Sequence, residues 1–484
     1  MAPSINHLLQ SGRLEQAFID GQWHAIETSD YLPVIDPSTE RVVGQLALCN
    51  TEHVDLAVAA AKDAFVSWSE SSVNERVALL TRIHQLILER TEIFARALSL
   101  EMGAAINSAR SAQVPLAAEH VRVAIENLSS YQFMTYRNTT AIAREPIGVC
   151  GLITPWNWPL YQITAKVAPA LAAGCTVVLK PSEQSPLSAY LFAEVMQDAG
   201  VPSGVFNLLN GNGEGVGAPL SAHKDVDMIS ITGSTRAGVH VAQAAAPTVK
   251  RVAQELGGKS PNIILPDADL EKAIAPGVAT CFRNVGQSCS APTRMIVPRG
   301  KLKQIEELAI NAINDIHMGN PQDEQTTHGP LANGAQFKRV QSLIQVGINE
   351  GAKLIAGGLG RPAGLDTGFY AKPTIFSDVT SQMSIAQEEV FGPVLVIIPY
   401  DNIEEAITIA NDTVYGLGAH VQGSDMDNVK KVASKIRSGQ VLLNYPAWDP
   451  YAPFGGYKSS GSGREFGIEG LEEYLETKAI IGFS

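Results

Sequence analysis

The strongest constraint on how this chain folds is a repeated order of short apolar runs, loops and helical segments between residues 147 and 245. The runs "IGVCGLI", "CTVVLK", "VFNLLN" and "VDMISIT" each lead into a polar or glycine-rich loop, with helical segments between them. This order predicts parallel strands whose crossover helices cover both faces of one sheet. Ligands of such sheets bind at the carboxyl ends of the strands, so these loops are the first candidates for a cofactor site.

The segment before this region is helical, and the segment after it is a second α/β region. With 484 residues the chain is too long for one compact core, so two or three domains are expected. Apolar residues at helical spacing predict helices over residues 53–68 and 74–90. After about residue 258, further helices and a strand are expected from residues 312–321, 335–352, 394–400 and 403–412.

Two further stretches do not fit either region. The polar stretch 132–140 is an extended excursion or a linker, and both interpretations are open at this point. The last residues, 474–484, are short and β-prone. No internal repeat and no low-complexity segment interrupts the chain.

Charge and cysteine content exclude several functional classes. The formal net charge is −13 and the basic residues are scattered, which argues against a nucleic-acid partner. The first residues lack a basic region followed by an apolar core, and no apolar run reaches membrane-spanning length. The five cysteines form no CxxC pair, so disulfides and a metal site are not expected. We therefore expect a cytoplasmic protein without a membrane partner.

Three loop motifs taken singly leave two interpretations open. Gly213-x-Gly215-x-x-Ala218 nearly satisfies a dinucleotide fingerprint but is equally a flexible turn entering a helix. "ITGST", residues 231–235, suits a pyrophosphate at a helix N-terminus but also an ordinary N-cap. Glu255 precedes two glycines in "ELGGKSP", where a carboxylate has room for water, although an isolated glutamate is usually a surface residue.

Cys289 lies in an unusual local sequence, "FRNVGQSCSAPTR". A free cysteine is usually a small buried hydrophobe in apolar surroundings. Here Gly286, Ser288, Ser290 and Ala291 are small, and Pro292 constrains the backbone after them. These neighbours indicate a thiol that other molecules approach, and a thiolate is a strong nucleophile.

Seven motifs in this order give the chain its resemblance to a known family: "TPWNWP", "KPSE", "ITGST", "ELGGKSP", "GQSC", "EEVFGP" and "PFGGYKSSGSGREFG". The set resembles the NAD(P)-dependent aldehyde dehydrogenase superfamily from about residue 18 to the C-terminus. The resemblance implies an α/β fold with a Rossmann-like cofactor domain, a second α/β catalytic domain and a β-strand oligomerisation arm. The implied NAD-binding domain is 1–124 and 145–257, the catalytic domain 258–444, the arm 125–144 and 470–484, and a segment returning to the active site 445–469.

The resemblance also implies a mechanism, the oxidation of an aldehyde to the carboxylic acid. Cys289 matches the nucleophile that forms a thiohemiacetal and then a thioester. Asn157 matches the side-chain donor to the oxyanion, with the Cys289 amide as second donor. Glu255 matches the base that activates water to hydrolyse the thioester. Lys166 and Glu465 match positions that orient water and relay protons.

The implied cofactor is NAD, with NADP possible, because Glu183 accepts hydrogen bonds from ribose hydroxyls and repels a 2′-phosphate. Lys180 and Glu183 match the adenosine ribose contacts, Gly233 and Ser234 the pyrophosphate contacts, and Glu389 the ligand of the nicotinamide ribose, with Phe391 beside it. Gly213 and Gly217 then lie beside the adenine. The remaining expected cofactor contacts are Ile153, Thr154, Pro155, Trp156, Ser182 and Leu256.

The expected substrate pocket is mainly aromatic, with Tyr161, Gln162, Trp448 and Phe454. Arg283, six residues before the nucleophile, either points to solvent or pairs with a carboxylate on the substrate. Two other functional classes are open: a CoA-acylating aldehyde dehydrogenase, whose members usually lack a glutamate at the position of Glu255, and a non-catalytic structural protein. A homodimer or homotetramer is expected.

Overall fold

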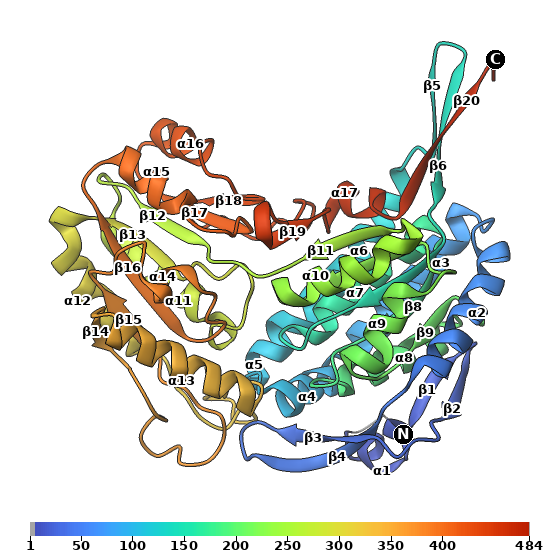
Figure 1. Ribbon diagram of the computed structural model, residues 1–484, viewed down its shortest axis with the longest axis horizontal. Helices are drawn as coiled ribbons and strands as arrows, with labels where there is room; N and C mark the ends of the chain where they lie inside the picture. Colours follow the sequence, from blue (N-terminus) through green and yellow to red (C-terminus); the bar gives the residue numbers. More distant parts are fainter. Residues whose placement is uncertain (1–4, 484) are drawn as a thin grey trace.

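The computed structural model of the chain describes residues 5–483, so residues 1–4 of the expected cofactor domain and residue 484 of the expected arm lie outside it. Two α/β bodies lie side by side, and a narrow sheet projects from one of them (Figure 1). No helix within residues 5–483 is long and apolar enough to cross a lipid bilayer.

The first body is built on an eight-stranded sheet with the order β19-β11-β10-β7-β8-β9-β1-β2. Its five central strands are parallel, which confirms the sequence-based prediction of a parallel sheet. The antiparallel hairpin of β1 and β2 extends one edge, and β19 pairs with the other. The strands are β1 Gln16–Ile19, β2 Gln22–Ala25, β7 Val149–Ile153, β8 Thr176–Lys180, β9 Phe206–Leu208, β10 Met228–Thr232, β11 Arg251–Glu255 and β19 Gly461–Ser462.

Helices cover both faces of this sheet. Residues of α3, α6, α7 and α8 share one core with Cys150 and Leu152 of β7, while α2, α9 and α10 share another with Val149. Alternate residues of a strand point to opposite faces, which explains the division. The helices are α2 Thr51–Trp68, α3 Val73–Glu89, α6 Val114–Ser130, α7 Pro159–Ala173, α8 Leu187–Ala199, α9 Ala218–Ala222 and α10 Thr235–Ala245.

The second body has a seven-stranded sheet with the order β14-β15-β16-β13-β12-β17-β18. Helices α11 and α12 share one core, and α13, α15 and α16 the other, so this sheet is also covered on both faces. The strands are β12 Pro261–Ile264, β13 Arg294–Pro298, β14 Lys353–Ala356, β15 Thr374–Ser377, β16 Val394–Tyr400, β17 Gly418–Gln422 and β18 Gln440–Leu443. The helices are α11 Leu270–Phe282, α12 Leu302–Ile313, α13 Gly334–Asn349, α15 Ile403–Asn411 and α16 Met426–Ala433.

One expected element of this body is wrong. Residues 312–321 belong to a helix only at their start, because α12 ends at Ile313 and turns and an isolated bridge follow. Gly319 and Pro321 disfavour a continued helix, since glycine costs backbone entropy and proline disfavours the helical conformation of the residue before it.

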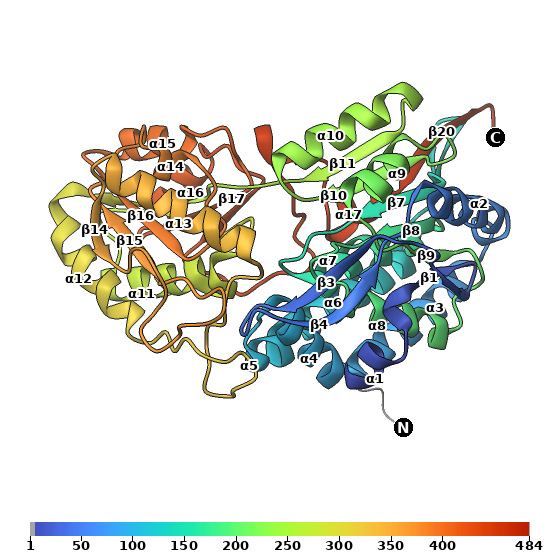
Figure 2. The same ribbon diagram turned by 60° about the horizontal axis from the view of Figure 1, so that its bottom comes forward.

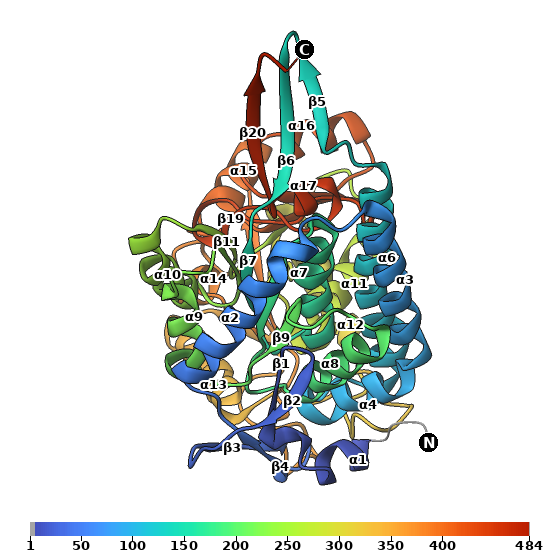
Figure 3. The ribbon, with the colours of Figure 1, turned by 90° about the vertical axis from the view of Figure 1, so that its right-hand side faces the viewer.

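The polar stretch 132–140 proves to be an excursion rather than a linker. β5 Met134–Arg137 and β6 Thr140–Pro146 form a hairpin, and β20 Leu475–Ile481 pairs antiparallel with β6. The strands of this sheet use only part of the 125–144 segment, because α6 continues to Ser130, and they extend to Pro146. Figure 3 shows the three strands pointing away from both bodies, with the described C-terminal end at their tip.

Smaller elements complete the fold. A second hairpin, β3 Tyr31–Asp36 with β4 Arg41–Ala47, lies at the lower edge of the molecule in Figure 1 and crosses its front in Figure 2. The remaining helices are α1 Ile5–Gln10, α4 Thr91–Met102, α5 Ile106–Ser108, α14 Ser384–Gln387 and α17 Gly467–Glu472.

Candidate active site

The carboxyl ends of the parallel strands bring the expected cofactor residues to one edge of the first sheet. Ile153 pairs with both Lys180 and Ile231, and Thr232 pairs with Glu255. The loops that follow β7, β8, β10 and β11 therefore start side by side. These loops carry Ile153, Thr154, Pro155, Trp156, Lys180, Ser182, Glu183, Gly233, Ser234 and Leu256.

The start of α10 has the form that a phosphate group requires. Ser234 is the N-cap, and its hydroxyl accepts a hydrogen bond from the Ala237 amide at 3.2 Å. A Cβ at Gly238 would lie 2.6 Å from Leu256 Cδ2, so glycine lets α10 pack closely on the end of β11. The exposed amides and the positive end of the helix dipole favour an anion here.

The adenosine end of a dinucleotide also fits. Lys180 Nζ lies 2.8 Å from Glu183 Oε2, so a carboxylate that suits ribose hydroxyls is held in place. A Cβ at Gly213 would meet no atom within 4 Å, and one at Gly217 only Asn212 O at 3.9 Å. A side chain at either position would therefore not clash with the protein itself. Glycine at both positions is consistent with a ligand that lies close to the backbone there.

A second carboxylate, Glu389, reaches this edge from the other body. Its Oε1 accepts a hydrogen bond from the Gly258 amide at 2.9 Å, and a Cβ at Gly257 would lie 2.3 Å from its Oε2. Burial raises the pKa of Glu389 to about 7. Phe391 packs edge-on against Trp156 with ring centroids 5.4 Å apart. The two bodies therefore meet at the expected nicotinamide end.

Cys289 lies in the loop between α11 and β13 and is the one cysteine of the described residues that is not fully buried. A Cβ at Gly258 would lie 2.3 Å from the Cys289 carbonyl oxygen, so this glycine permits the loop to approach the end of the first sheet. Burial, followed by the negative charges of Glu255, Glu389 and Glu465, raises the pKa of the Cys289 thiol. Both effects favour the protonated form of the thiol over the thiolate.

Asn157 lies two residues before the start of α7, next to the N-cap Trp158, with 3% of its surface exposed. One amide hydrogen of its Nδ2 is donated to the carbonyl oxygen of Gln287 at 2.9 Å, two residues before Cys289. The second hydrogen of this amide remains for a ligand. The Cys289 amide has no hydrogen-bond acceptor within the described part of the chain. Two donors are thus available beside the thiol.

Glu255 ends β11 with 3% of its surface exposed, and neither of its carboxylate oxygens has a hydrogen-bond partner among residues 5–483. Burial and then the charge of Glu465 raise the pKa of Glu255 well above its ordinary value, against the opposing effect of Lys166. A buried carboxyl with a raised pKa and free oxygens is a candidate general base.

The aromatic side chains of the expected substrate pocket come together around a histidine. The His120 ring lies 4.2 Å from Tyr161, 4.5 Å from Phe466 and 6.2 Å from Trp448, measured between centroids. Phe454 stacks on Phe466 at 5.4 Å. Burial lowers the pKa of His120 to about 3, so its ring is neutral.

Sequence reasoning missed His120 and Phe466. Phe466 follows Glu465 directly inside the matched motif "GREFG", so the aromatic residue there was a usable signal. His120 carries no local signal, because it is a single histidine on the helix α6.

Gln162 and Arg283 complete the expected pocket residues. Gln162 is 4% exposed and its Oε1 has no partner among the described residues. Arg283 directly follows α11 and is exposed, and within residues 5–483 it makes no hydrogen bond, ion pair or cation–π contact.

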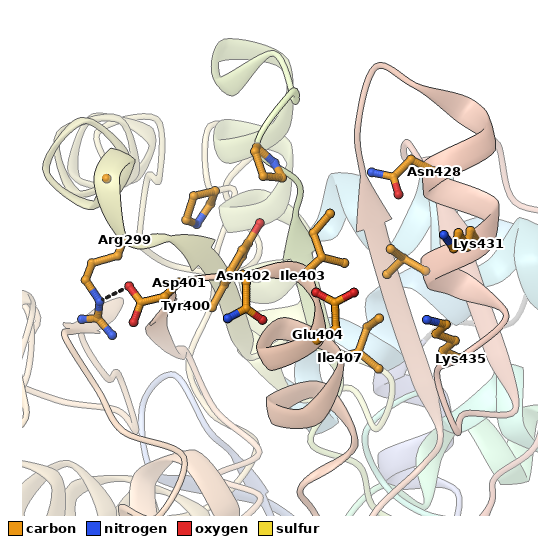
Figure 4. Close-up of a pocket in the computed structure, with 14 residues that line it drawn as sticks. Arg299, Tyr400, Asp401, Asn402, Ile403, Glu404, Ile407, Asn428, Lys431 and Lys435 are labelled. Carbon is orange, nitrogen blue, oxygen red and sulfur yellow. Dashed lines mark hydrogen bonds and ion pairs between the residues drawn. The ribbon is translucent and has the colours of Figure 1, made fainter.

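A groove of about 530 Å³ lies away from this site, at the carboxyl ends of β12, β13 and β16. Figure 4 shows Ile403 and Glu404 of α15 on one side of it and Lys431 and Lys435 of α16 on the other. Cys289 precedes β13, so the groove and the thiol lie at opposite edges of the second sheet. None of the residues that converge around the thiol lines this groove.

Comparison with known proteins agrees with this geometry. A model of the aldehyde dehydrogenase family matches residues 23–480. A 3-succinoylsemialdehyde-pyridine dehydrogenase from a Pseudomonas species is 54% identical over 467 residues, which are 96% of this chain and 98% of that protein.

Solved structures are similar over nearly the whole chain. An aldehyde dehydrogenase C variant from Pseudomonas syringae, complexed with NAD+ and octanal, has a TM-score of 0.98 and 62% identity over 100% of this chain and 99% of that chain. An aldehyde dehydrogenase from Bartonella henselae has a TM-score of 0.95 and 44% identity over 96% of this chain and 99% of that chain. The chain therefore belongs to the aldehyde dehydrogenase family, and it is an oxidoreductase that oxidises aldehydes to carboxylic acids through a catalytic cysteine.

Proposed function

We propose that Cys289 is the nucleophile of this reaction, that Asn157 and the Cys289 amide bind the oxyanion, and that Glu255 is the general base. The observation that carries the proposal is the convergence of these groups. Asn157 bonds to the segment preceding Cys289, and Glu255 ends a strand of the adjoining sheet while its charge acts on the thiol. The domain assignment belongs to the same proposal, with 145–257 binding the cofactor and 258–444 carrying the nucleophile.

The chemistry proceeds from these residues. The thiol of Cys289 releases its proton to solvent, and its sulfur adds to the carbonyl carbon of the aldehyde to give a thiohemiacetal. Asn157 Nδ2 and the Cys289 amide donate hydrogen bonds to the developing oxyanion. Loss of hydride from that carbon leaves a thioester on Cys289. Glu255 removes a proton from water, and the water oxygen attacks the thioester carbon. The C–S bond then breaks, the proton held by Glu255 passes to the departing thiolate, and the carboxylic acid is released.

The proposed cofactor is NAD, with NADP a weaker alternative. The site fits a dinucleotide at the N-terminus of α10, at the Lys180–Glu183 pair and at Glu389. When bound, NAD+ supplies the hydride acceptor. The complex of the Pseudomonas syringae relative with NAD+ supports this choice.

The proposed substrate is an uncharged aldehyde with an aliphatic or aromatic tail. Tyr161, Trp448 and Phe454 supply an apolar wall, and Gln162 offers a polar amide. Octanal in the Pseudomonas syringae complex and the pyridine-bearing semialdehyde named for the Pseudomonas relative point to the same class. Arg283 is exposed, and the proposal assigns it no role in binding a carboxylate of the substrate.

The test is NADH formation with octanal, benzaldehyde and a carboxylated semialdehyde, in the wild type and in Cys289→Ala. We expect activity with the first two substrates, and a loss of several orders of magnitude in kcat for Cys289→Ala while NAD still binds. Retention of more than a few per cent of kcat would overturn the nucleophile assignment. A requirement for CoA would instead favour the acylating alternative, which Glu255 disfavours.

The three-stranded sheet is proposed as an oligomerisation arm in a homodimer or homotetramer. Its strands expose Tyr136 and Ile481, 61% and 83% exposed, and neighbouring Phe483 is 50% exposed. Exposed apolar side chains on edge strands favour pairing with another copy. A cytoplasmic location remains part of this proposal.

A further inference from the structure

We propose that Asn284 is a positioning residue that orients Asn157, the donor to the oxyanion. The inference rests on the role proposed for Asn157, and a double-mutant experiment separates the two. Asn284 is not among the residues that the sequence predicts for the site. It lies five residues before Cys289, in the short turn η5, Arg283–Gly286.

The side-chain amide of Asn284 forms hydrogen bonds to both segments of the proposed oxyanion site, the one that contains Asn157 and the one that precedes Cys289. Its Nδ2 donates to the carbonyl oxygen of Asn157 at 2.8 Å and to that of Gln287 at 3.3 Å. The Gln287 carbonyl also accepts from Asn157 Nδ2 at 2.9 Å. One side-chain amide thus holds the backbone of Asn157 and the carbonyl that orients the Asn157 side chain.

The Asn284 side chain is itself held in place. Gln113, 2% exposed, donates from Nε2 to Asn284 Oδ1 at 3.4 Å. Gln113 ends the π-helical turn η2, Ala109–Gln113, and such turns are frequent at functional sites. Gln287 Nε2 donates to the Asn284 carbonyl at 3.2 Å, and Gln287 Oε1 accepts from the Ala332 amide at 2.9 Å.

The backbone explains why an asparagine stands here. Asn284 has φ 52° and the next residue, Val285, has φ 57°, so the chain passes through the left-handed region just before the nucleophile. Asparagine tolerates this region better than most residues, and glycine tolerates it without steric cost. Of asparagine and glycine, only asparagine has a side-chain amide whose N–H groups can donate to the neighbouring carbonyls.

The test replaces Asn284 by glycine, because Asn284→Gly keeps the left-handed backbone and removes only the side-chain hydrogen bonds. Misplacing a catalytic group by about 1 Å can cost about a hundredfold in rate. We expect kcat with octanal and the rate of the NADH burst to fall by about ten- to a hundredfold. The KM for octanal and the Kd for NAD should change by less than about threefold, since Asn284 contacts neither ligand in this proposal.

A double-mutant cycle separates positioning from a general structural effect. If Asn284 acts through Asn157, then Asn284→Gly has no further effect on kcat in an Asn157→Ala background. Independent, multiplying effects would overturn the inference, as would wild-type kcat in Asn284→Gly. Full activity of Asn157→Ala alone would instead overturn the proposed function.

Asn444 offers a matched control. It also has a positive φ, 53°, and its Nδ2 donates to the Gly423 carbonyl at 2.9 Å, away from the Cys289 loop. Asn444→Gly should lose about as much thermal stability as Asn284→Gly does, but its kcat should stay within about threefold of the wild-type value. If Asn284→Gly does not fold, Asn284→Asp keeps the size but cannot donate to the two carbonyls, and wild-type burst kinetics in that variant would overturn the inference.

Discussion

Lys166 on α7 and Glu465 form a buried ion pair whose two charges act in opposite directions on Glu255. The ammonium of Lys166 contacts the carboxylate of Glu465 and donates to Ser230 Oγ at 3.0 Å, with the Lys166 side chain fully inaccessible to solvent. Burial is the main cause of the raised pKa of Glu255; the charge of Glu465 raises it further and that of Lys166 lowers it, so the pair adjusts where the proposed base ionises.

Glu465→Gln should move the acid limb of the kcat profile to lower pH. Glu255 acts as a base only when ionised, and a neutral glutamine removes a charge that raises its pKa, while Lys166 remains to lower it. We expect the acid limb to lie at lower pH than in the wild type, measured by steady-state NADH formation across pH. The control is Glu472→Gln, because the Glu472 carboxylate accepts a hydrogen bond from Tyr131 and is not paired with Lys166. Equal pH profiles of kcat for the two variants would contradict the effect assigned to Glu465.

Glu255→Gln should slow deacylation in particular. Glutamine preserves the shape but cannot take a proton from water, and loss of a general base costs about 10²- to 10⁴-fold. Stopped-flow measurement should show a burst of up to one NADH per active site, followed by a very slow steady state. If the burst falls together with the steady state, Glu255 also removes the thiol proton of Cys289, and the proposed division of roles is wrong.

NAD should be preferred over NADP, and Glu183 should carry the preference. The negative charge of Glu183 beside Lys180 repels a 2′-phosphate. Glu183→Gln should lower the preference for NAD, measured as kcat/KM with NAD divided by kcat/KM with NADP, by about fivefold. The reason is that an interaction between two partly exposed charges is worth about 1 kcal/mol. A clear preference of the wild type for NADP would refute the cofactor proposal.

Arg283→Ala should leave the KM for octanal and the KM for a carboxylated semialdehyde within about threefold of the wild type. Arg283 is exposed and makes no hydrogen bond or ion pair within residues 5–483, so its removal breaks none in the pocket. A tenfold to hundredfold rise in KM for the semialdehyde alone would show a charged hydrogen bond to the substrate, worth about 1.5–3 kcal/mol.

If the three-stranded sheet is the proposed oligomerisation arm, removing residues 477–484 should give monomer or aggregate in place of the proposed homodimer or homotetramer. The cut leaves Tyr474 and Leu475, which are buried in the main core, and removes most of β20. Loss of this strand exposes the edge of β6, which then lacks its intrachain partner. Light scattering measures the outcome, and an unchanged oligomer would contradict the role of the arm.

The sequence by itself determined the parallel sheet, its flanking helices and the family. The strand–loop–helix order between residues 147 and 245 corresponds to β7, β8, β9 and β10 with α7, α8 and α10. Such patterns are readable because strand and helix periods are local properties of the chain. The glycines at 257 and 258 were readable for a similar reason, since close backbone approach tolerates no side chain.

Only the tertiary structure decided which distant residues meet. Asn284 contacts Asn157 across 127 positions, and Lys166 contacts Glu465 across 299. His120 is a further example, because only the fold shows that its ring stacks on Phe466. No local period encodes such contacts, because they depend on how the two bodies and the returning segment pack together. The sequence therefore predicts the reacting groups, whereas the packing sets the pKa of Glu255 and the orientation of Asn157.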